Sequence, residues 1–174
     1  MPQAPDRLQW AVERLNVQPD QRILEIGCGP GVAAGLVAQR LETGRLTAID
    51  RSVTAIQRAI RRNAVPIAAG QVEFHTCDLA GFDRGHRLFD VVFAMNVNVF
   101  WTGPADREWA VLAEILRPRG RLLLFYGYGT GDPTAGRDVT SPIRRAMESR
   151  GYAVRLDAIP DGSSVCVAGQ LAGP

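Results

Sequence analysis

The stretch Arg22-Ile-Leu-Glu-Ile-Gly-Cys-Gly-Pro-Gly-Val32 decides the fold of this chain. A short apolar strand that carries Glu25 runs into a turn with three glycines, and a helical pattern starts at once after it. This order places backbone N–H groups and the positive end of a helix beside whatever lies over the strand tip. The glycines supply positive φ angles and remove Cβ atoms that would block a ligand. The stretch therefore predicts a ligand-binding strand, turn and helix.

The spacing of the glycines narrows the kind of ligand. A dinucleotide-binding turn normally reads G-x-G-x-x-G, but here the third glycine, Gly31, comes one residue early and Val32 takes its place. Glu25 stands two residues before the first glycine, where an acid repels phosphate and favours a cation. The turn therefore favours a nucleoside with a positive charge, and a nicotinamide-dependent oxidoreductase is the less favoured alternative.

The segment from Glu25 to Gly31 resembles the first motif of class I S-adenosylmethionine-dependent methyltransferases, E/D-x-G-x-G-x-G. In that family the motif wraps the amino-acid end of the cofactor, a zwitterion attached to a sulfonium. The resemblance implies S-adenosylmethionine as cofactor and S-adenosylhomocysteine as product. It also implies cofactor contacts from Glu25, Gly27, Cys28, Gly29 and Gly31.

Length and composition are those of a globular domain. The chain has 174 residues, of which 46% are hydrophobic and 22% charged, and its net charge of +2 gives no argument for nucleic acid or an anionic membrane. We expect a single methyltransferase-like domain over residues 1–174. Its expected parts are an N-terminal helix or cover at 1–18, a cofactor-binding core at 20–127, and a C-terminal helix and strand hairpin at 128–174.

Cysteine spacing and hydropathy point to a reduced protein without a membrane segment. Cys28, Cys77 and Cys166 form no C-x-x-C pair and no zinc pattern with histidine, so we expect three free thiols and no metal. The N-terminus shows no signal-peptide pattern. No apolar stretch approaches the ~20 residues of a membrane span. A cytoplasmic location is the expectation.

Strand and helix patterns alternate along the chain. Strands are expected at 21–26, 45–50, 71–76, 88–95, 121–126, 152–158 and 164–168, and helices at 6–15, 32–42, 52–63, 104–116 and 141–150. Alternation with buried apolar strands predicts a mostly parallel sheet with helices on both faces. The short turn at 160–162 permits only an antiparallel pair of strands. The expected fold is α/β, a Rossmann-like seven-stranded sheet that ends in an antiparallel hairpin, as in the methyltransferases.

Acids follow two further strands. Asp50 ends the second strand, where an ionised carboxylate can accept both hydroxyls of a ribose, and Arg51 beside it is expected at the same site. The alternative for Asp50 is a cap for the helix that starts after Ser52. After the third strand, Asp78 and Leu79 match family positions where an acid accepts the adenine amine and the next residue covers the ring. A solvated loop aspartate is the alternative for Asp78.

The fourth strand ends at Asn96, and in the family this strand end faces the transferred methyl group. Asn96 is therefore expected beside the cofactor, and Asn96, Trp101 and Tyr126 are the candidates for catalytic residues. For Trp101, a place in the core is the alternative. Neither His75 nor His86 stands at this strand end, and a methyl on a sulfonium is already activated. We therefore predict in-line transfer mainly through positioning, without an identified base.

Motif absences favour a small-molecule acceptor. The fourth strand continues as Asn96-Val-Asn-Val99 in place of an Asn/Asp-Pro-Pro-Tyr/Phe motif, which argues against methylation of amines on DNA bases. The arginines of 58–62 predict only a solvated helix face. The first helix with Trp10 and the loop 127–134 are the expected cover of the site. The alternative function is binding of S-adenosylmethionine or S-adenosylhomocysteine without transfer, as a sensor or partner.

Overall fold

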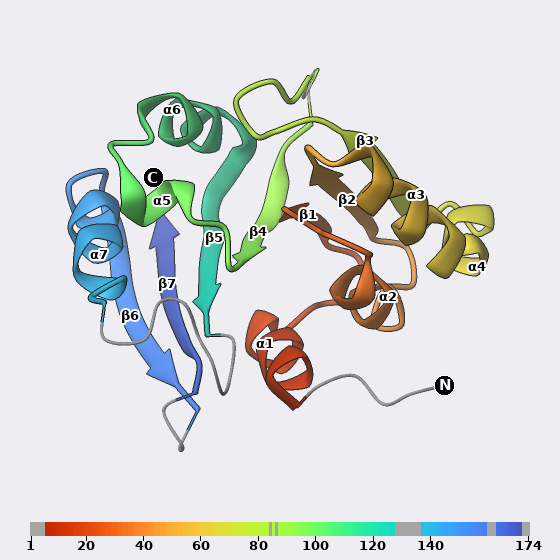
Figure 1. Cartoon of the computed structure of the whole chain (residues 1–174), viewed down its shortest axis with the longest axis horizontal. Coiled ribbons are helices and arrows are strands. Elements are labelled where there is room, and N and C mark those ends of the chain that lie inside the picture. Colours follow the sequence, from red (N-terminus) through yellow and green to blue (C-terminus); the bar gives the residue numbers. More distant parts are fainter. Residues whose placement is uncertain (1–5, 84, 86, 128–136, 160–162, 172–174) are drawn as a thin grey trace.

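The computed structural model describes residues 6–83, 85, 87–127, 137–159 and 163–171. Its centre is a seven-stranded sheet with the order β3-β2-β1-β4-β5-β7-β6 (Figure 1). The strands are β1 (Arg22–Ile26), β2 (Arg45–Asp50), β3 (Val72–Thr76), β4 (Phe89–Met95), β5 (Leu116–Tyr126), β6 (Tyr152–Ala158) and β7 (Val165–Leu171). Strands β1 to β5 pair in parallel, and β7 is antiparallel to both β5 and β6. The predicted α/β fold with an antiparallel C-terminal hairpin is confirmed.

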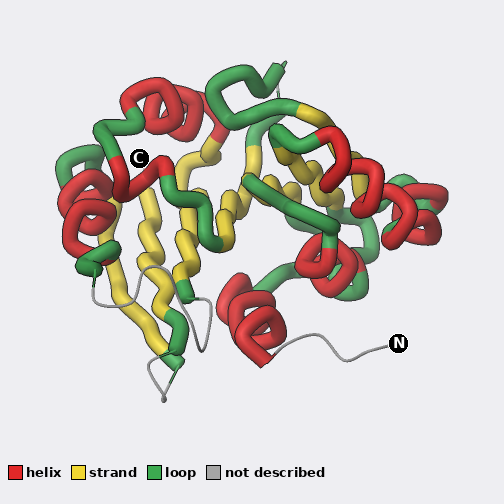
Figure 2. Tube along the Cα trace, in the orientation of Figure 1, coloured by secondary structure: helices red, strands yellow, loops and turns green. Residues whose placement is uncertain are grey.

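Helices cover both faces of this sheet, as Figure 2 shows. They are α1 (Asp6–Leu15), α2 (Val32–Ala38), α3 (Val53–Arg62), α4 (Ala64–Ala68), α5 (Val99–Thr102), α6 (Asp106–Ile115) and α7 (Thr140–Glu148). Neighbouring residues of β1 point to opposite faces, so Ile23 packs with α1 and α2 whereas Leu24 packs with α5, α6 and α7. Within the described ranges, no helix has the length and apolar character needed to cross a bilayer.

Some predicted boundaries were wrong by a few residues. The helix expected at 32–42 ends at Ala38, and the helix expected from Pro104 begins at Asp106. Residue Ala105, just before that helix, has a φ of 50°, so the chain turns sharply there and leaves Pro104 outside the helix. The strand expected at 121–126 already begins at Leu116, directly after α6. Helices α4 and α5 were not predicted, because each is too short to show a periodic pattern.

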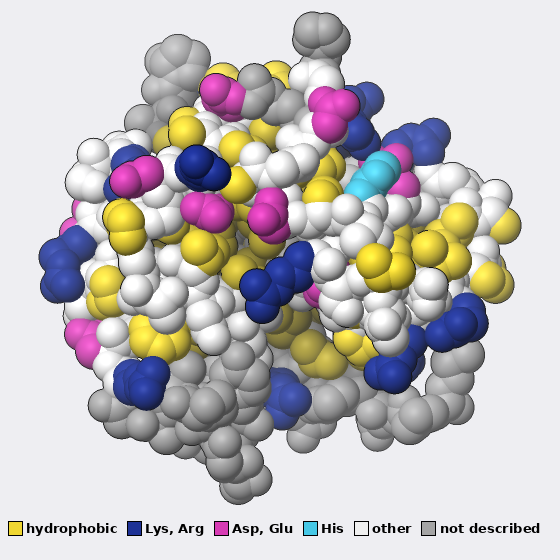
Figure 3. Space-filling view, turned by 45° about the horizontal axis from the view of Figure 1, so that its top comes forward, with side chains coloured by type: hydrophobic (Ala, Val, Ile, Leu, Met, Phe, Trp, Pro, Cys, Tyr) yellow, Lys and Arg dark blue, Asp and Glu magenta, His cyan; other side chains and the backbone are white. Residues whose placement is uncertain are grey.

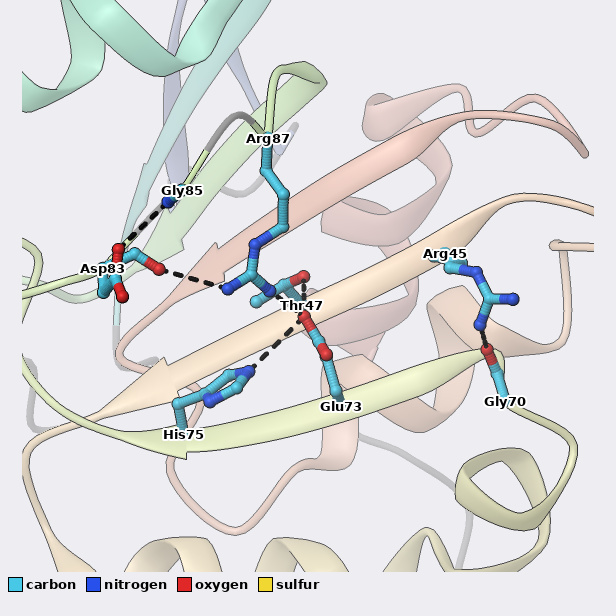
Figure 4. A network of polar contacts seen from close by, with 8 residues as sticks. All are labelled: Arg45, Thr47, Gly70, Glu73, His75, Asp83, Gly85 and Arg87. Carbon is cyan, nitrogen blue, oxygen red and sulfur yellow. Dashed lines mark hydrogen bonds and ion pairs between the residues drawn. The ribbon is translucent and has the colours of Figure 1, made fainter.

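The connection between β3 and β4, residues 77–88, contains no helix among its described residues. A polar network fastens it to the sheet instead (Figure 4). Arg87 of the connection forms an ion pair with Glu73 of β3. Glu73 also accepts a hydrogen bond from the Thr47 hydroxyl (2.8 Å) and lies 3.4 Å from Nε2 of His75. His75 is therefore a strand residue of this network, as predicted. We call Thr47, Glu73, His75 and Arg87 the β3 network.

Three sequence expectations fall outside the described residues. They concern the loop at 128–134, the turn at 160–162, and His86. The cover that the loop was expected to provide stays a prediction.

Candidate functional site

The glycine turn after β1 has the backbone conformation that its sequence predicts. Gly27, Gly29 and Gly31 have φ angles of 70°, 52° and 72°. A Cβ atom on Gly27 would lie 2.6 Å from Cγ2 of Val97, and one on Gly31 would lie 2.6 Å from Nδ2 of Asn63. A Cβ atom on Gly29 would meet nothing within 4 Å. Packing and the φ angle therefore both require glycine at positions 27 and 31, whereas at position 29 the φ angle alone favours it.

Asn63, at the end of α3, holds this turn in place. Its side chain is buried, and Nδ2 donates hydrogen bonds of 2.9 Å to the carbonyls of Gly31 and Ala59. Nearby, Nε of Arg62 donates to the carbonyl of Pro30 (3.1 Å). Sequence reasoning placed only a helix end here, because the contact joins residues far apart in the chain.

Asp50 reaches the same turn from the end of β2. Its Oδ2 accepts a hydrogen bond of 2.8 Å from the Gly29 N–H, and its Oδ1 accepts one of 2.8 Å from the Ser52 N–H. The cap of α3 is Ser52, whose hydroxyl accepts from the Ala55 N–H. Asp50 therefore supports the helix start without being its cap, and it faces the glycine turn.

Glu25 lies buried beneath the turn, with 2% of its surface exposed. Its Oε2 has no hydrogen-bond partner within the described part of the chain. Burial, and then the charge of Asp50, raise the pKa of Glu25 to about 8. The same surroundings raise the pKa of the Cys28 thiol, mainly through burial, so Cys28 is not a nucleophile at neutral pH. A bound cation near Glu25 would favour its ionised form.

A cavity of about 560 Å³ opens at the carboxyl ends of β1, β2 and β4. Six residues predicted to bind the cofactor line it: Gly27, Asp50, Arg51, Asp78, Leu79 and Asn96. The other four, Glu25, Cys28, Gly29 and Gly31, lie in or beneath the turn and are not part of the lining. We call this space the acidic cavity. Figure 3 shows a face of the molecule with a hollow near its middle, where hydrophobic and charged side chains meet.

The charge of the lining suits a cation. Asp50, Asp78 and Glu108 bring carboxylates to the acidic cavity, and Arg51 is the basic residue in its described lining. Glu108 lies in the first turn of α6, where an acid complements the helix dipole. Its place at the cavity depends on how α6 packs on the sheet, which no local pattern shows. Among the described residues, no group of three or more side chains is arranged to hold a metal ion.

Asn96 and Tyr126 join the ends of β4 and β5. Asn96 has a φ of 57°, its Nδ2 donates to the Gly127 carbonyl (3.2 Å), and its Oδ1 accepts from the Gly127 N–H (3.0 Å). The Tyr126 hydroxyl donates to the Val97 carbonyl (2.7 Å). An amide fixed in this way orients the strand end and offers no base.

Trp101, the third catalytic candidate, is not part of the described cavity linings. Its Nε1 donates to Oδ1 of Asn98 (3.2 Å), and Arg137 lies over its ring. Its neighbour Phe100 is buried against Trp109 of α6. Trp101 itself is half-buried and packs against the same core cluster, which agrees with the core alternative.

A second, smaller cavity of about 90 Å³ lies beside the first. Met95 and Asn96 line both cavities. One side of the smaller cavity is formed by α1, with Arg7 and Trp10, and the opposite side by the ends of β4 and β5. We call it the α1 cavity. Figure 1 shows α1 next to the carboxyl ends of these strands, where the sequence predicted a cover.

Comparison with known proteins identifies the family of this chain. Residues 23–120, more than half of the chain, match the family described as Methyltransferase domain. Trans-aconitate 2-methyltransferase of Escherichia coli (strain 55989 / EAEC) is 30% identical over 122 residues, which are 68% of this chain and 45% of that protein. The tRNA1(Val) (adenine(37)-N6)-methyltransferase of Vibrio campbellii (strain ATCC BAA-1116) is 32% identical over 78 residues, which are 45% of this chain and 33% of that protein. The chain spans less than half the length of these relatives.

Solved structures show the same fold. A SAM dependent methyltransferase from Aquifex aeolicus superposes with a TM-score of 0.79 at 15% identity, over 95% of this chain and 89% of that chain. At this identity the likeness concerns the fold alone. The family match, the fold and the glycine turn with its acidic cavity agree, and this chain belongs to the class I S-adenosylmethionine-dependent methyltransferase family.

Proposed function

We propose that this chain transfers a methyl group from S-adenosylmethionine to a small molecule. The observation that supports the proposal most is the acidic cavity, because it lies against a glycine turn and its lining favours a nucleoside that carries a positive charge. When bound there, S-adenosylmethionine supplies a methyl group already activated by the sulfonium.

In this proposal, residues at different strand ends bind different parts of the cofactor. Asp50 accepts hydrogen bonds from the ribose hydroxyls, with Arg51 beside it, and Asp78 accepts one from the adenine amine, with Leu79 against the ring. The backbone from Gly27 to Gly31, which includes Cys28 and Gly29, surrounds the amino-acid end, and Glu25 beneath it favours the cation. Asn96 then stands at the strand end nearest the transferred methyl.

The polar groups around Asn96 are suited to positioning the reactants. Its amide is held by Gly127, and the hydroxyl of Tyr126 is held by the Val97 carbonyl, so both shape the site and keep it rigid. A rigid site that excludes water and aligns two reactants lowers the barrier without proton transfer.

Two observations support a small-molecule acceptor: the share of this chain that each relative matches, and the size of the α1 cavity. The relatives include both a trans-aconitate methyltransferase and a tRNA methyltransferase, but the first match covers 68% of this chain and the second 45%. The α1 cavity of about 90 Å³ admits a small group, since one water molecule takes ~30 Å³ of the liquid. The net charge of +2 gives no broad attraction to a nucleic acid.

The test has a binding part and a transfer part. Calorimetry should show that the purified protein binds S-adenosylhomocysteine. The methyl-labelled cofactor should then yield a labelled product from a filtered small-metabolite extract, and none from total RNA offered in parallel. Label found only in RNA would contradict the small-molecule acceptor. Absence of binding would contradict the whole proposal.

A second candidate is binding without transfer, as a sensor or partner. It is favoured by the local hydrogen bonds that engage the polar atoms of the three catalytic candidates, Asn96, Trp101 and Tyr126. Tight binding of S-adenosylhomocysteine without turnover on small metabolites or RNA would select this candidate.

A further inference from the structure

Strand β6 is the last strand of the described sheet, so β7 is its one neighbouring strand there. The N–H of Ile159, just after β6, donates to the Ser164 carbonyl (3.0 Å). In an antiparallel pair every second residue exchanges hydrogen bonds with its partner, so Asp157 and Arg155 also turn their backbone groups toward β7. The backbone groups of the residues between them, such as Leu156, point to the outer edge. An outer edge of this kind is a template for another strand.

Helix α7 covers only the first part of β6. Tyr152 is buried and Val154 is half-buried in a core cluster that includes residues of α7. Leu156 lies on the same face, because side chains of a strand repeat their direction every second residue, but it is 45% exposed. Figure 1 shows the C-terminal end of β6 extending past α7. The outer edge therefore carries an exposed leucine beyond the cover of this helix.

The opposite face of β6 carries two opposite charges. Arg155 is exposed, and within the described residues it has no hydrogen bond or ion pair. Burial, and then the charge of Arg155, lower the pKa of Arg121, so the nearest described charge repels Arg155. Asp157 pairs through Oδ2 with Nε of Arg14 (3.1 Å), and its Oδ1 accepts from the outward N–H of Ala158 (3.1 Å). Arg155 thus lacks a counter-charge, while one oxygen of Asp157 blocks a donor of the free edge.

The charges select one register in which two copies of β6 can pair antiparallel about a two-fold axis. With the axis at Leu156, Arg155 of each copy lies opposite Asp157 of the other. Moving the axis by one residue places Arg155 opposite Arg155, or Asp157 opposite Asp157, and like charges repel. The register at Leu156 also fits the backbone. It pairs Leu156 with Leu156 and Val154 with Ala158, and all of these residues turn their backbone groups outward.

We propose that β6 pairs antiparallel with β6 of a second copy of this chain, with the two-fold axis at Leu156. Oδ1 of Asp157 turns from the Ala158 N–H to Arg155 of the second copy, which supplies the missing counter-charge. The released N–H then donates to the Val154 carbonyl of that copy, and the two Leu156 side chains cover each other. Strands β5 and β7 lie between β6 and β4, so the acidic cavity is not part of this interface. The dimer does not depend on the proposed function.

Sedimentation velocity of the purified chain, from micromolar to near-millimolar concentration, tests the proposal. Because one strand from each copy forms the contact, we expect a reversible dimer whose share rises with concentration. Leu156→Pro removes an outward N–H but no hydrogen bond to β7, and proline is tolerated at such edge positions. This variant should stay monomeric at every concentration, with a Tm within a few degrees of wild type.

Charge reversal tests the register. Arg155→Asp places acids opposite acids, and Asp157→Arg places arginines opposite arginines, so each variant alone should raise the dimer Kd at least tenfold. A mixture of the two variants brings opposite charges together at both contacts and should form a mixed dimer with a Kd within fivefold of wild type. Arg58→Asp makes the same change of charge at an exposed position of α3, and it is the matched control that should leave the Kd unchanged.

The remaining outcomes contradict the proposal. A wild-type chain that is monomeric at every concentration overturns the dimer and leaves the edge to solvent or to a different partner. A dimer that forms equally well in Leu156→Pro and Arg155→Asp uses another surface. If the wild type dimerises but the mixed variants stay monomeric, the register at Leu156 is wrong.

Discussion

The carboxylate of Asp50 accepts a hydrogen bond of 2.8 Å from the backbone N–H of Gly29, so the end of β2 is tied directly to the turn after β1. One side chain therefore serves the shape of the turn and, in our proposal, the ribose. Asp50→Ala should raise the Kd for S-adenosylhomocysteine at least tenfold, since hydrogen bonds to a charged group contribute roughly 1.5–3 kcal/mol. Calorimetry measures this. Asp20→Ala, at an exposed position, is the control, and a Kd within twofold of wild type for Asp50→Ala would contradict the assignment.

Glu25 should make the stability of the ligand-free protein depend on pH. Its pKa is raised from 4.5 to about 8, so the folded state keeps a proton that the unfolded chain releases. Stability should therefore fall as the pH rises between these values, by up to ~1.4 kcal/mol per pH unit. Urea unfolding at a series of pH values measures it, and Glu25→Gln should flatten the curve. Parallel curves for the two proteins would show that Glu25 does not carry the dependence.

The affinity for the cofactor should change with pH in the opposite sense. A cation bound near Glu25 favours its ionised form, so binding releases a proton. The Kd for S-adenosylmethionine should decrease as the pH rises toward 8, and this dependence should be weaker in Glu25→Gln. Calorimetry in buffers of different ionisation enthalpy counts the released protons.

Cys77 offers a test that needs no substitution. It lines the acidic cavity and is half-buried, whereas Cys28 and Cys166 are only 5% and 1% exposed. Burial, and then Asp78, raise the pKa of the Cys77 thiol, so alkylation should be slow at pH 7 and faster above pH 8. Saturating S-adenosylhomocysteine should slow the alkylation of Cys77 at least fivefold, as followed by peptide mass spectrometry. The same rate with and without ligand would place the ligand elsewhere.

The β3 network should influence cofactor affinity from outside the acidic cavity. Arg87 and Glu73 fasten the connection that carries Asp78 and Leu79 (Figure 4). Arg87→Met should weaken binding of S-adenosylhomocysteine two- to fivefold, because a partly exposed ion pair contributes up to ~1 kcal/mol. Arg45→Met is a matched control, since Arg45 binds the Gly70 carbonyl at the opposite end of β2. Equal Kd values for the two variants would mean that the network holds only the fold.

The sequence predicted those features that are determined by residues close together in the chain. The glycine turn follows from φ angles that only glycine adopts easily, and the parallel strands follow from continuous apolar runs such as 91–95. The fold class and the residues gathered around β1 and β2 could be predicted for this reason. Roles for individual residues remain predictions.

Features that depend on packing between distant segments could not be predicted. Asn63 reaches Gly31 across thirty-two positions, and Glu108 meets the acidic cavity only because α6 lies over the sheet. Element ends were missed for a similar reason. The start of β5 at Leu116, for example, is set by its pairing with Phe89 of β4.

The two cavities draw their linings from different parts of the chain. The acidic cavity is built mainly from strand ends and the segments that follow them, together with residues of α5 and α6, and the strand ends cannot change without disturbing the sheet. The α1 cavity takes one side from a single amphipathic helix near the start of the chain. Replacing that helix face would therefore be the simplest way to redirect such an enzyme to a new compound, in the laboratory or during evolution.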